Sequence, residues 1–377
     1  MTRTHSVSRN PFFSLVGLLF VAAIGSFLVG CVTVRMTIPD EMTPILDTKG
    51  CTYTVFKEEA LWTVVPEEKL LPPRGSYALR VDPKTSRVTA RVYIPEQILT
   101  SFDVSEGALW VAAGDYAPEI YKIDPDTSRV VASVRVGPIS IFGSPVRLAV
   151  GAGAVWAVRG GDLFRVDPKS NDVTSIPLSR YVLDVTIVEN TVWVHLFDQS
   201  TISRIDARTG QLAAATVAPP EHLDITSRDF FGSFAAAERP AWSRWMTAGA
   251  DGMWVLLHFG KSLPQYVGRV DLQLNQIVAT NQGQFEAIIT DIAASEAAIW
   301  VSAFNKGWFS VTTHYSIVEL DPKTTFVKRK IPYASVSSIY SAMPTMAVGA
   351  GTMWVCLPDS GLYRVPLGSG KEMKGYF

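Results

Sequence analysis

The stretch Gly151-Ala-Gly-Ala-Val-Trp156-Ala-Val, followed by Leu163-Phe-Arg-Val-Asp-Pro168, contains the unit from which the chain is built. A glycine turn precedes an apolar run that holds Trp156, and a second apolar run ends at Asp167. The pattern recurs in looser form along the chain, where seven tryptophans mark it: Trp62, Trp110, Trp156, Trp193, Trp254, Trp300 and Trp354. Each of the first six is followed by an apolar run that ends at Asp82, Asp124, Asp167, Asp206, Asp271 or Asp321.

The spacing of these tryptophans predicts the fold. Trp156 and Trp193 lie 37 residues apart, Trp193 and Trp254 lie 61 apart, and the other spacings fall between these values. A period of roughly 40–50 residues with several short strands is typical of propellers. The units are rich in Val, Ile, Thr and Trp and lack helical spacing of apolar residues. We therefore predict an all-β, seven-bladed β-propeller of four-stranded antiparallel blades over residues 51–367.

One unit divides into four strands, at residues 147–150, 154–158, 163–166 and 173–176. Asp167-Pro168 lies between the last two strands. Asp at the start of a turn accepts a backbone hydrogen bond, and Pro next to it presets a type I turn. We predict that Asp82, Asp124, Asp167 and Asp321, each followed by Pro, form turns rather than act as acids. The repeated tryptophans are predicted to pack blade against blade.

The last unit lacks its fourth strand and is followed by a polar tail at residues 368–377. Residues 32–39, Val-Thr-Val-Arg-Met-Thr-Ile-Pro, read like the fourth strand at residues 88–95, Val-Thr-Ala-Arg-Val-Tyr-Ile-Pro. We therefore predict that residues 32–38 close the ring as the outer strand of the seventh blade. This would cover the edge that a three-stranded blade exposes.

The N-terminal residues 1–30 have the pattern of a targeting segment, with Arg3 and Arg9 ahead of an apolar run. The run ends in Leu28-Val29-Gly30-Cys31, which resembles the lipobox of bacterial lipoproteins. The resemblance implies a signal peptide over residues 1–30, a lipid on Cys31 and a lipid-anchored segment over 31–50. The alternative is an uncleaved membrane helix. Either reading places the propeller in the cell envelope, and Val32 rather than Asp implies the outer membrane or cell surface.

The repeat itself resembles a known group of proteins. Gly-Ala-Gly-Ala-Val-Trp-Ala-Val, an Arg-Val-Asp-Pro turn and a Val-rich strand look like the repeats of virginiamycin B lyase-like and YVTN-type seven-bladed propellers. The resemblance covers residues 51–366. It implies the fold, and it implies function only loosely, because the group includes lyases and lactonase-like hydrolases as well as proteins of no known activity.

The net charge limits the classes of partner that the protein can bind, and the cysteine content bears on its disulfide bonds. A formal net charge of −1 gives no electrostatic basis for a nucleic-acid partner. Cys51 and Cys356 remain after Cys31 is assigned to the lipid. In an oxidising compartment they either form a disulfide that joins the first and last blades or stay as two separate buried thiols.

Strand parity predicts which face of the propeller carries function. The turns between strands one and two and between strands three and four are short and share one face, here called the short-turn face. The longer connections share the other face, here called the variable face. The largest of them covers residues 219–243 and, with Trp245 just after it, holds three Phe and two Trp. Binding residues concentrate on loops of rigid scaffolds. The aromatic residues of that insertion form either a lid or an exposed patch for a partner.

Candidate ligand residues follow from aligning the units on tryptophan. The position nine residues before it is expected near the channel mouth on the variable face, and it holds Tyr53, Ser101, Arg147, Asp184, Trp245, Asp291 and Thr345. The alternative is a solvated rim without a ligand. His195, His222, His258 and His314 also map to the variable side, at no metal-ligand spacing. The candidate ligand set is Arg147, Asp184, Trp245, Asp291, His258 and His314, and the sequence identifies no cofactor or metal.

We therefore favour a non-enzymatic, lipid-anchored binding or scaffolding protein. Its expected partners are the membrane, which it reaches through the lipid anchor, and other envelope proteins or a small-molecule ligand, which it binds through the variable face. The alternative is a metal-assisted lyase or lactonase-like hydrolase that acts on a small molecule at the channel mouth.

Overall fold

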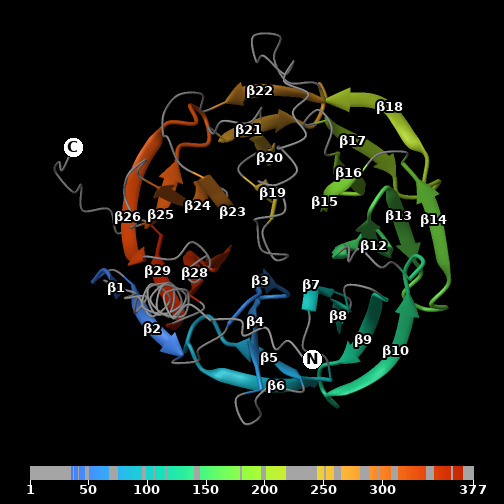
Figure 1. The fold of residues 1–377 in the computed structure, drawn as a ribbon, viewed down its shortest axis with the longest axis horizontal. Coiled ribbons are helices and arrows are strands. Elements are labelled where there is room, and N and C mark those ends of the chain that lie inside the picture. The colour runs from blue at the N-terminus through green and yellow to red at the C-terminus, as the bar shows by residue number, and fades with distance from the viewer. Residues whose placement is uncertain are drawn as a thin grey trace, which may run out of the picture.

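The fold is a ring of seven antiparallel sheets around a central axis, which confirms the predicted seven-bladed β-propeller (Figure 1). A computed structural model describes residues 35–36, 38–40, 42–46, 51–67, 75–95, 99–105, 107–114, 117–139, 145–178, 181–196, 201–217, 244–249, 252–258, 265–280, 288–295, 297–306, 313–336, 344–357 and 360–367. Every regular element within these ranges is a β-strand. No helix that is long and apolar enough to cross a membrane occurs within them.

Each blade is one sheet whose first strand lies nearest the axis and whose last strand lies on the rim (Figure 1). Blade one holds β3 (Thr54–Lys57), β4 (Ala60–Pro66), β5 (Ser76–Val81) and β6 (Val88–Ile94). Blade two holds β7 (Leu99–Ser105), β8 (Ala108–Ala113), β9 (Glu119–Asp124) and β10 (Arg129–Arg135). Blade three holds β11 (Arg147–Gly151), β12 (Ala154–Arg159), β13 (Asp162–Val166) and β14 (Val173–Pro177). Blade four holds β15 (Val182–Val188), β16 (Thr191–Leu196), β17 (Thr201–Asp206) and β18 (Leu212–Val217).

The remaining blades include strands from the N-terminal segment. Blade five holds β19 (Met246–Gly249), β20 (Gly252–His258), β21 (Gln265–Asp271) and β22 (Gln276–Thr280). Blade six holds β23 (Ile288–Ala294), β24 (Ile299–Lys306), β25 (Thr313–Leu320) and β26 (Val327–Val336), with β1 (Arg35–Met36) as a fifth strand outside β26. Blade seven holds β27 (Thr345–Gly349), β28 (Thr352–Leu357) and β29 (Gly361–Pro366), and β2 (Thr43–Leu46) is its outer strand.

The repeated tryptophans lie on the second strand of each blade and are buried, with at most 3% of each side chain exposed. In six blades a basic residue of the third strand lies directly opposite: Arg80, Lys122, Arg165, Arg204, Arg269 or Arg364. The Lys122 ammonium, for example, lies 5.3 Å from the ring centroid of Trp110. A cation over an aromatic face is attracted by the ring quadrupole. The rings also pack against the next blade, as predicted: Trp110 shares a buried apolar cluster with Leu148 of blade three, and Trp354 shares one with Leu61 of blade one.

Blade six departs from this arrangement, because Glu319 lies opposite Trp300. The cation there comes from the next strand. Arg329 of β26 places its guanidinium 5.1 Å from the Trp300 ring centroid and donates a 3.2 Å hydrogen bond to Glu319. The contact between cation and tryptophan is thus kept although the sequence position of the cation changes.

The aspartates between the third and fourth strands form turns, as predicted. The Asp167 carboxylate accepts hydrogen bonds from the backbone N–H groups of Lys169 (2.8 Å) and Ser170 (3.0 Å). The same pair of bonds recurs at Asp82, Asp124, Asp206, Asp271 and Asp321. These backbone donors favour the ionised form and lower the pKa of each carboxyl below its ordinary value, to about 2 at Asp321.

The repeated turns predict a sensitivity to acid. A carboxyl whose pKa is lower in the folded state stabilises the fold above its unfolded pKa, and this contribution is lost as the pH falls through the folded value. For Asp321 the window runs from the ordinary value of 3.8 down to about 2. We expect the thermal midpoint to fall across this window and to fall less steeply in Asp321→Asn, because Asn forms the same turn without titrating. Unfolding followed by circular dichroism against pH tests this, and equal slopes for the two proteins would contradict it.

The ring is closed by an N-terminal strand in the last blade, but the prediction that residues 32–38 supply it is wrong. The closing strand is β2, which pairs Thr43 with Arg364 and Leu46 with Leu362. Residues 35–36 pair instead with β26 of blade six, and residues 32–34 and 37 lie outside the described residues. The physical reason is connection length: a seven-residue link joins β2 to β3, whereas a strand that ended at residue 38 would need a fifteen-residue link.

A disulfide between Cys51 and Cys356 lies next to this closure, with the two Cα atoms 5.9 Å apart. Cys51 precedes the first strand of blade one, and Cys356 lies on β28 of blade seven. Both side chains are fully buried. The bond and β2 together join the two ends of the ring.

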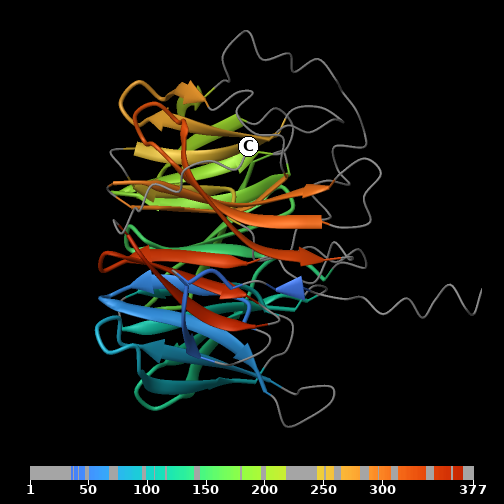
Figure 2. The same ribbon diagram turned by 90° about the vertical axis from the view of Figure 1, so that its left-hand side faces the viewer.

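The face assignment follows from the strand pairing. Neighbouring strands within every blade are antiparallel, so the short turns emerge on one face and the longer connections on the other. The described turns between first and second strands are tight, as at residues 58–59, 152–153 and 189–190. The connection from β18 to β19 begins and ends on the variable face, and Figure 2 shows the strands running from one face to the other. The insertion itself, residues 219–243, lies outside the described residues.

Candidate functional site: the central channel

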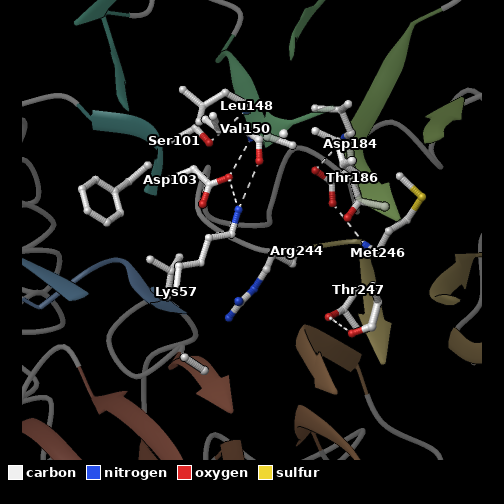
Figure 3. Close-up of a pocket in the computed structure, with 18 of the residues that line it drawn as sticks. Lys57, Ser101, Asp103, Leu148, Val150, Asp184, Thr186, Arg244, Met246 and Thr247 are labelled. Atoms are coloured by element: carbon white, nitrogen blue, oxygen red, sulfur yellow. Dashed lines mark hydrogen bonds and ion pairs between the residues drawn. The ribbon is translucent and has the colours of Figure 1, made fainter. Parts of the chain in front are cut away.

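The first strands of all seven blades line a central cavity of about 500 Å³. Each of these strands is the inner edge of its sheet, so one row of its backbone N–H and C=O groups has no strand to pair with. Buried backbone groups need other hydrogen-bond partners. The polar side chains around the channel supply many of them, as Figure 3 shows for Ser101, Asp103 and Asp184.

Three polar residues at the aligned position each cap the inner edge of the next blade. The Ser101 hydroxyl accepts a 3.0 Å hydrogen bond from the Leu148 N–H, which links blade two to blade three. The Asp184 carboxylate accepts from Met246 (3.2 Å) and links blade four to blade five. The Asp291 carboxylate accepts from Met346 (2.9 Å) and links blade six to blade seven. We call Ser101, Asp184 and Asp291 the edge-capping residues.

A register shift immediately precedes each edge-capping residue, between Leu99 and Ser101, between Val182 and Asp184, and between Ile289 and Asp291. β11 of blade three pairs without such a shift, and its residue at the aligned position is Arg147. A β-bulge bends the strand and re-aims the neighbouring side chain. The bulges therefore coincide with the side chains that reach the next blade.

Asp184 is a buried carboxyl beside the cavity. It accepts hydrogen bonds from the backbone N–H groups of Val185 (2.9 Å) and Trp245 (2.7 Å) as well as Met246. Burial raises the pKa of Asp184, while the Arg147 charge and these backbone donors act in the opposite direction. The Asp184 carboxyl thus joins blades four and five, although burial removes it from water.

Asp291 is fully buried and carries the most bonds of the three. The Arg244 guanidinium donates to it from Nε (3.1 Å) and from a terminal nitrogen (2.9 Å), and the Arg244 backbone N–H adds a third bond at 3.1 Å. The same guanidinium also donates to the Met346 carbonyl. Arg244 therefore spans blades five, six and seven with one side chain, and its own side chain remains 30% exposed toward the cavity.

Lys57 and Asp103 form a second polar link inside the channel (Figure 3). The Lys57 ammonium lies 2.7 Å from the Asp103 carboxylate and also donates to the Val150 carbonyl at 3.4 Å. Asp103 accepts from the Val150 N–H at 2.8 Å. One lysine of blade one thereby contacts blades two and three.

The predicted ligand residues are only partly brought together. Arg147 and Asp184 line the cavity. Trp245 and Asp291 are buried, Trp245 against the His195 ring with centroids 5.6 Å apart and Asp291 against Arg244. His314 is exposed on β25 in blade six, and the side chain of His258 lies outside the described residues, as does all of His222. The described residues contain no cluster of three metal-ligating side chains.

The cavity residues Lys57, Asp103 and Arg244 are not among the sequence candidates. A signal for one of them exists in the same alignment. The position seven residues before the tryptophan lines the cavity in every blade, with Val55, Asp103, Ala149, Thr186, Thr247, Ala293 and Ala347. Asp103 is the only charged residue of this layer, so aligning the units at this position would have identified it.

Fold and channel together define the chain as a seven-bladed β-propeller. Among solved structures it is similar to the WD40 repeats of RRP9, with a TM-score of 0.59 and 8% identity over 89% of this chain and 100% of that one. It is also similar to U3-55K, with a TM-score of 0.55 and 9% identity over 89% of this chain and 98% of that one. At this identity the likeness shows the fold alone. No family model and no curated protein matches the sequence.

Proposed function

We propose that the chain is a lipid-anchored protein of the cell envelope that binds or scaffolds partners through its variable face. The observation that favours a scaffold over an enzyme is that three channel carboxylates hold neighbouring blades together. Asp103, Asp184 and Asp291 each accept hydrogen bonds from backbone N–H groups of a neighbouring blade. A general acid or base must reach its substrate. Carboxylates held this way build a rigid ring that presents loops, as a binding scaffold requires.

The lipid anchor predicts a specific covalent state. We expect the mature wild-type chain to begin at Cys31 and to carry acyl groups on that residue, and Cys31→Ser to keep residues 1–30 and carry none. Mass spectrometry of the N-terminal peptide after expression in a bacterium measures both. Thr33→Ser is the matched control and should process normally. A wild-type chain that retains residues 1–30 without acyl groups would favour the membrane-helix alternative.

If a partner protein binds the variable face, its capture should depend on the loops of that face. Crosslinking in solubilised membranes should capture a protein that is lost on deletion of residues 221–243. It should be retained when Ser170, in a turn on the short-turn face, is replaced by Ala. An unchanged set of captured proteins after the deletion would count against the binding proposal.

The enzymatic alternative, a metal-assisted lyase or lactonase-like hydrolase, keeps support from Asp184 and Arg147 at the cavity. A desolvated carboxyl beside a charged partner in a cleft is typical of functional sites. Metal analysis of protein purified without chelator distinguishes the two proposals. Stoichiometric divalent metal that is lost in His258→Ala would favour the enzyme, and its absence would favour the scaffold. The resemblance to virginiamycin B lyase-like and YVTN-type propellers stays a prediction beyond the fold.

A further inference from the structure

The N-terminal strand β1 fixes where the chain leaves the propeller. Arg35 pairs with Ser335 and Met36 with Ala334, near the end of β26. β26 starts at the short turn after Asp321 and runs to the variable face. Because β1 is antiparallel to it, Arg35 lies at the variable-face end of blade six, where Figure 2 shows β1 at the edge of the ring.

The length of chain before β1 limits where Cys31 can lie. Arg35 lies four positions after Cys31. An extended chain spans at most about 3.5 Å per residue, so Cys31 lies within about 14 Å of Arg35. The eight residues of β25 span about 26 Å between the two faces. With β1 paired, Cys31 can lie beside the variable face and cannot reach the short-turn face.

The charge of the short-turn face favours the same orientation. In the described turns of the short-turn face, acidic residues outnumber basic ones. The acidic residues are Glu58, Glu59, Asp82, Asp126, Asp167, Asp172, Glu189 and Asp321, and the basic residues are Lys84, Arg87, Lys169, Arg208 and Lys323. Anionic lipid headgroups repel such a surface.

Apolar exposure does not separate the faces. Ile139 is exposed on the variable face, and Leu274 and Phe326 are exposed on the short-turn face. The orientation is therefore indicated by the direction of the chain at β1 and by the acidic charge of the short-turn face.

We propose that the variable face lies against the membrane that holds the lipid on Cys31, with the acidic short-turn face directed away from it. The proposal rests on the proposed lipidation of Cys31. The channel end that carries Arg147, Asp184 and Arg244 then opens toward the lipid headgroups. A partner or ligand that binds the variable face then comes from the membrane surface.

The orientation can be measured with dyes on the two faces of one blade. His314→Cys places a thiol at the start of β25, and Phe326→Cys places one in the opposite turn of the same blade. The native disulfide and the acylated Cys31 leave the new thiol for labelling. Ile139→Cys and Leu274→Cys form a second pair, with similar exposure of 68% and 63%, elsewhere on the ring. The lipidated proteins are placed in vesicles of phosphatidylethanolamine and phosphatidylglycerol with an acceptor dye on the headgroups.

We expect stronger energy transfer to the headgroups from residue 314 than from residue 326, and from 139 than from 274. Equal or reversed transfer in vesicle-bound protein would overturn the proposed orientation. Failure of the wild-type protein to float with vesicles would instead overturn the lipid anchor, so the two failures are distinguishable.

A linker variant supplies the matched control. Inserting about 20 Gly and Ser residues between Thr33 and Val34 adds a flexible chain with an end-to-end distance of about 25 Å. This variant should float as well as the parent protein and lose most of the difference between the faces. If it keeps the full difference, the short tether does not set the orientation.

Discussion

Replacing Cys51 and Cys356 by alanine is expected to lower the free energy of unfolding by about 3–5 kcal/mol. The disulfide connects residues 305 positions apart, so it closes a loop that contains nearly the whole propeller. Cross-linking a long loop removes much conformational freedom from the unfolded chain. The bond also joins blade seven to the segment that enters blade one, where the ring would otherwise open.

The single variants sharpen this prediction. Cys51→Ala and Cys356→Ala should each cost about as much as the double variant, because either one removes the same bond. Treatment of the wild-type protein with a reductant should produce a similar loss and should not affect the variants. Denaturant unfolding with and without reductant measures all four cases. Small, additive losses that do not respond to reductant would indicate two separate buried thiols.

Local sequence pattern was sufficient to predict most of the fold. The glycine turn, the tryptophan and the terminal aspartate recur in register, and each is tied to a local cause. Asp167, for example, accepts bonds from N–H groups two and three residues later, so its role depends on its immediate neighbours. The assignment of the two faces followed because antiparallel strands alternate in direction. Such features can be predicted from the sequence without knowledge of contacts between distant residues.

The choice between two open edges was not predictable in this way. Residues 32–39 have the pattern of a fourth strand, and that pattern suits any outer edge. Blade six offered the long edge of β26, and blade seven offered β29. Pairing of β2 with β29 leaves the shorter link to β3, so the cost of the connection decided between them. The pattern correctly predicted an outer strand in this segment, but it assigned that strand to blade seven instead of blade six.

The channel residues show a similar limit. Alignment on tryptophan placed Arg147 and Asp184 beside the cavity, but it treated Trp245 and Asp291, which are not among the residues that line the cavity, as equivalent to them. Bulges before Ser101, Asp184 and Asp291 are not marked by any residue type that the alignment compares. They depend on how each inner strand meets the next blade. The cation at Trp300 likewise comes from Arg329, one strand beyond the expected position.

Asp291→Ala is expected to destabilise the propeller by about 3–5 kcal/mol, the usual cost of removing one member of a buried ion pair. The carboxylate is fully buried and bonds to the Arg244 guanidinium at 2.9 Å and to the Met346 N–H at 2.9 Å. Its removal leaves a cation and a buried N–H group without their acceptor. Arg244→Ala should cost at least as much as Asp291→Ala, because it leaves the fully buried Asp291 carboxylate with backbone N–H donors and no cation, whereas the Arg244 cation left by Asp291→Ala is 30% exposed.

Ser101 provides the comparison that separates an edge-capping role from mere burial. It occupies the same aligned position in blade two and accepts one hydrogen bond, from Leu148 at 3.0 Å. Ser101→Ala should therefore cost about 1 kcal/mol, the net value of one neutral hydrogen bond. Denaturant unfolding of the three variants under one set of conditions gives the ranking. If Asp291→Ala costs no more than Ser101→Ala, the Asp291 carboxylate does not hold blades six and seven together. That result would remove the main reason for giving the channel carboxylates a structural role. It would also remove the main reason for preferring a scaffold over an enzyme.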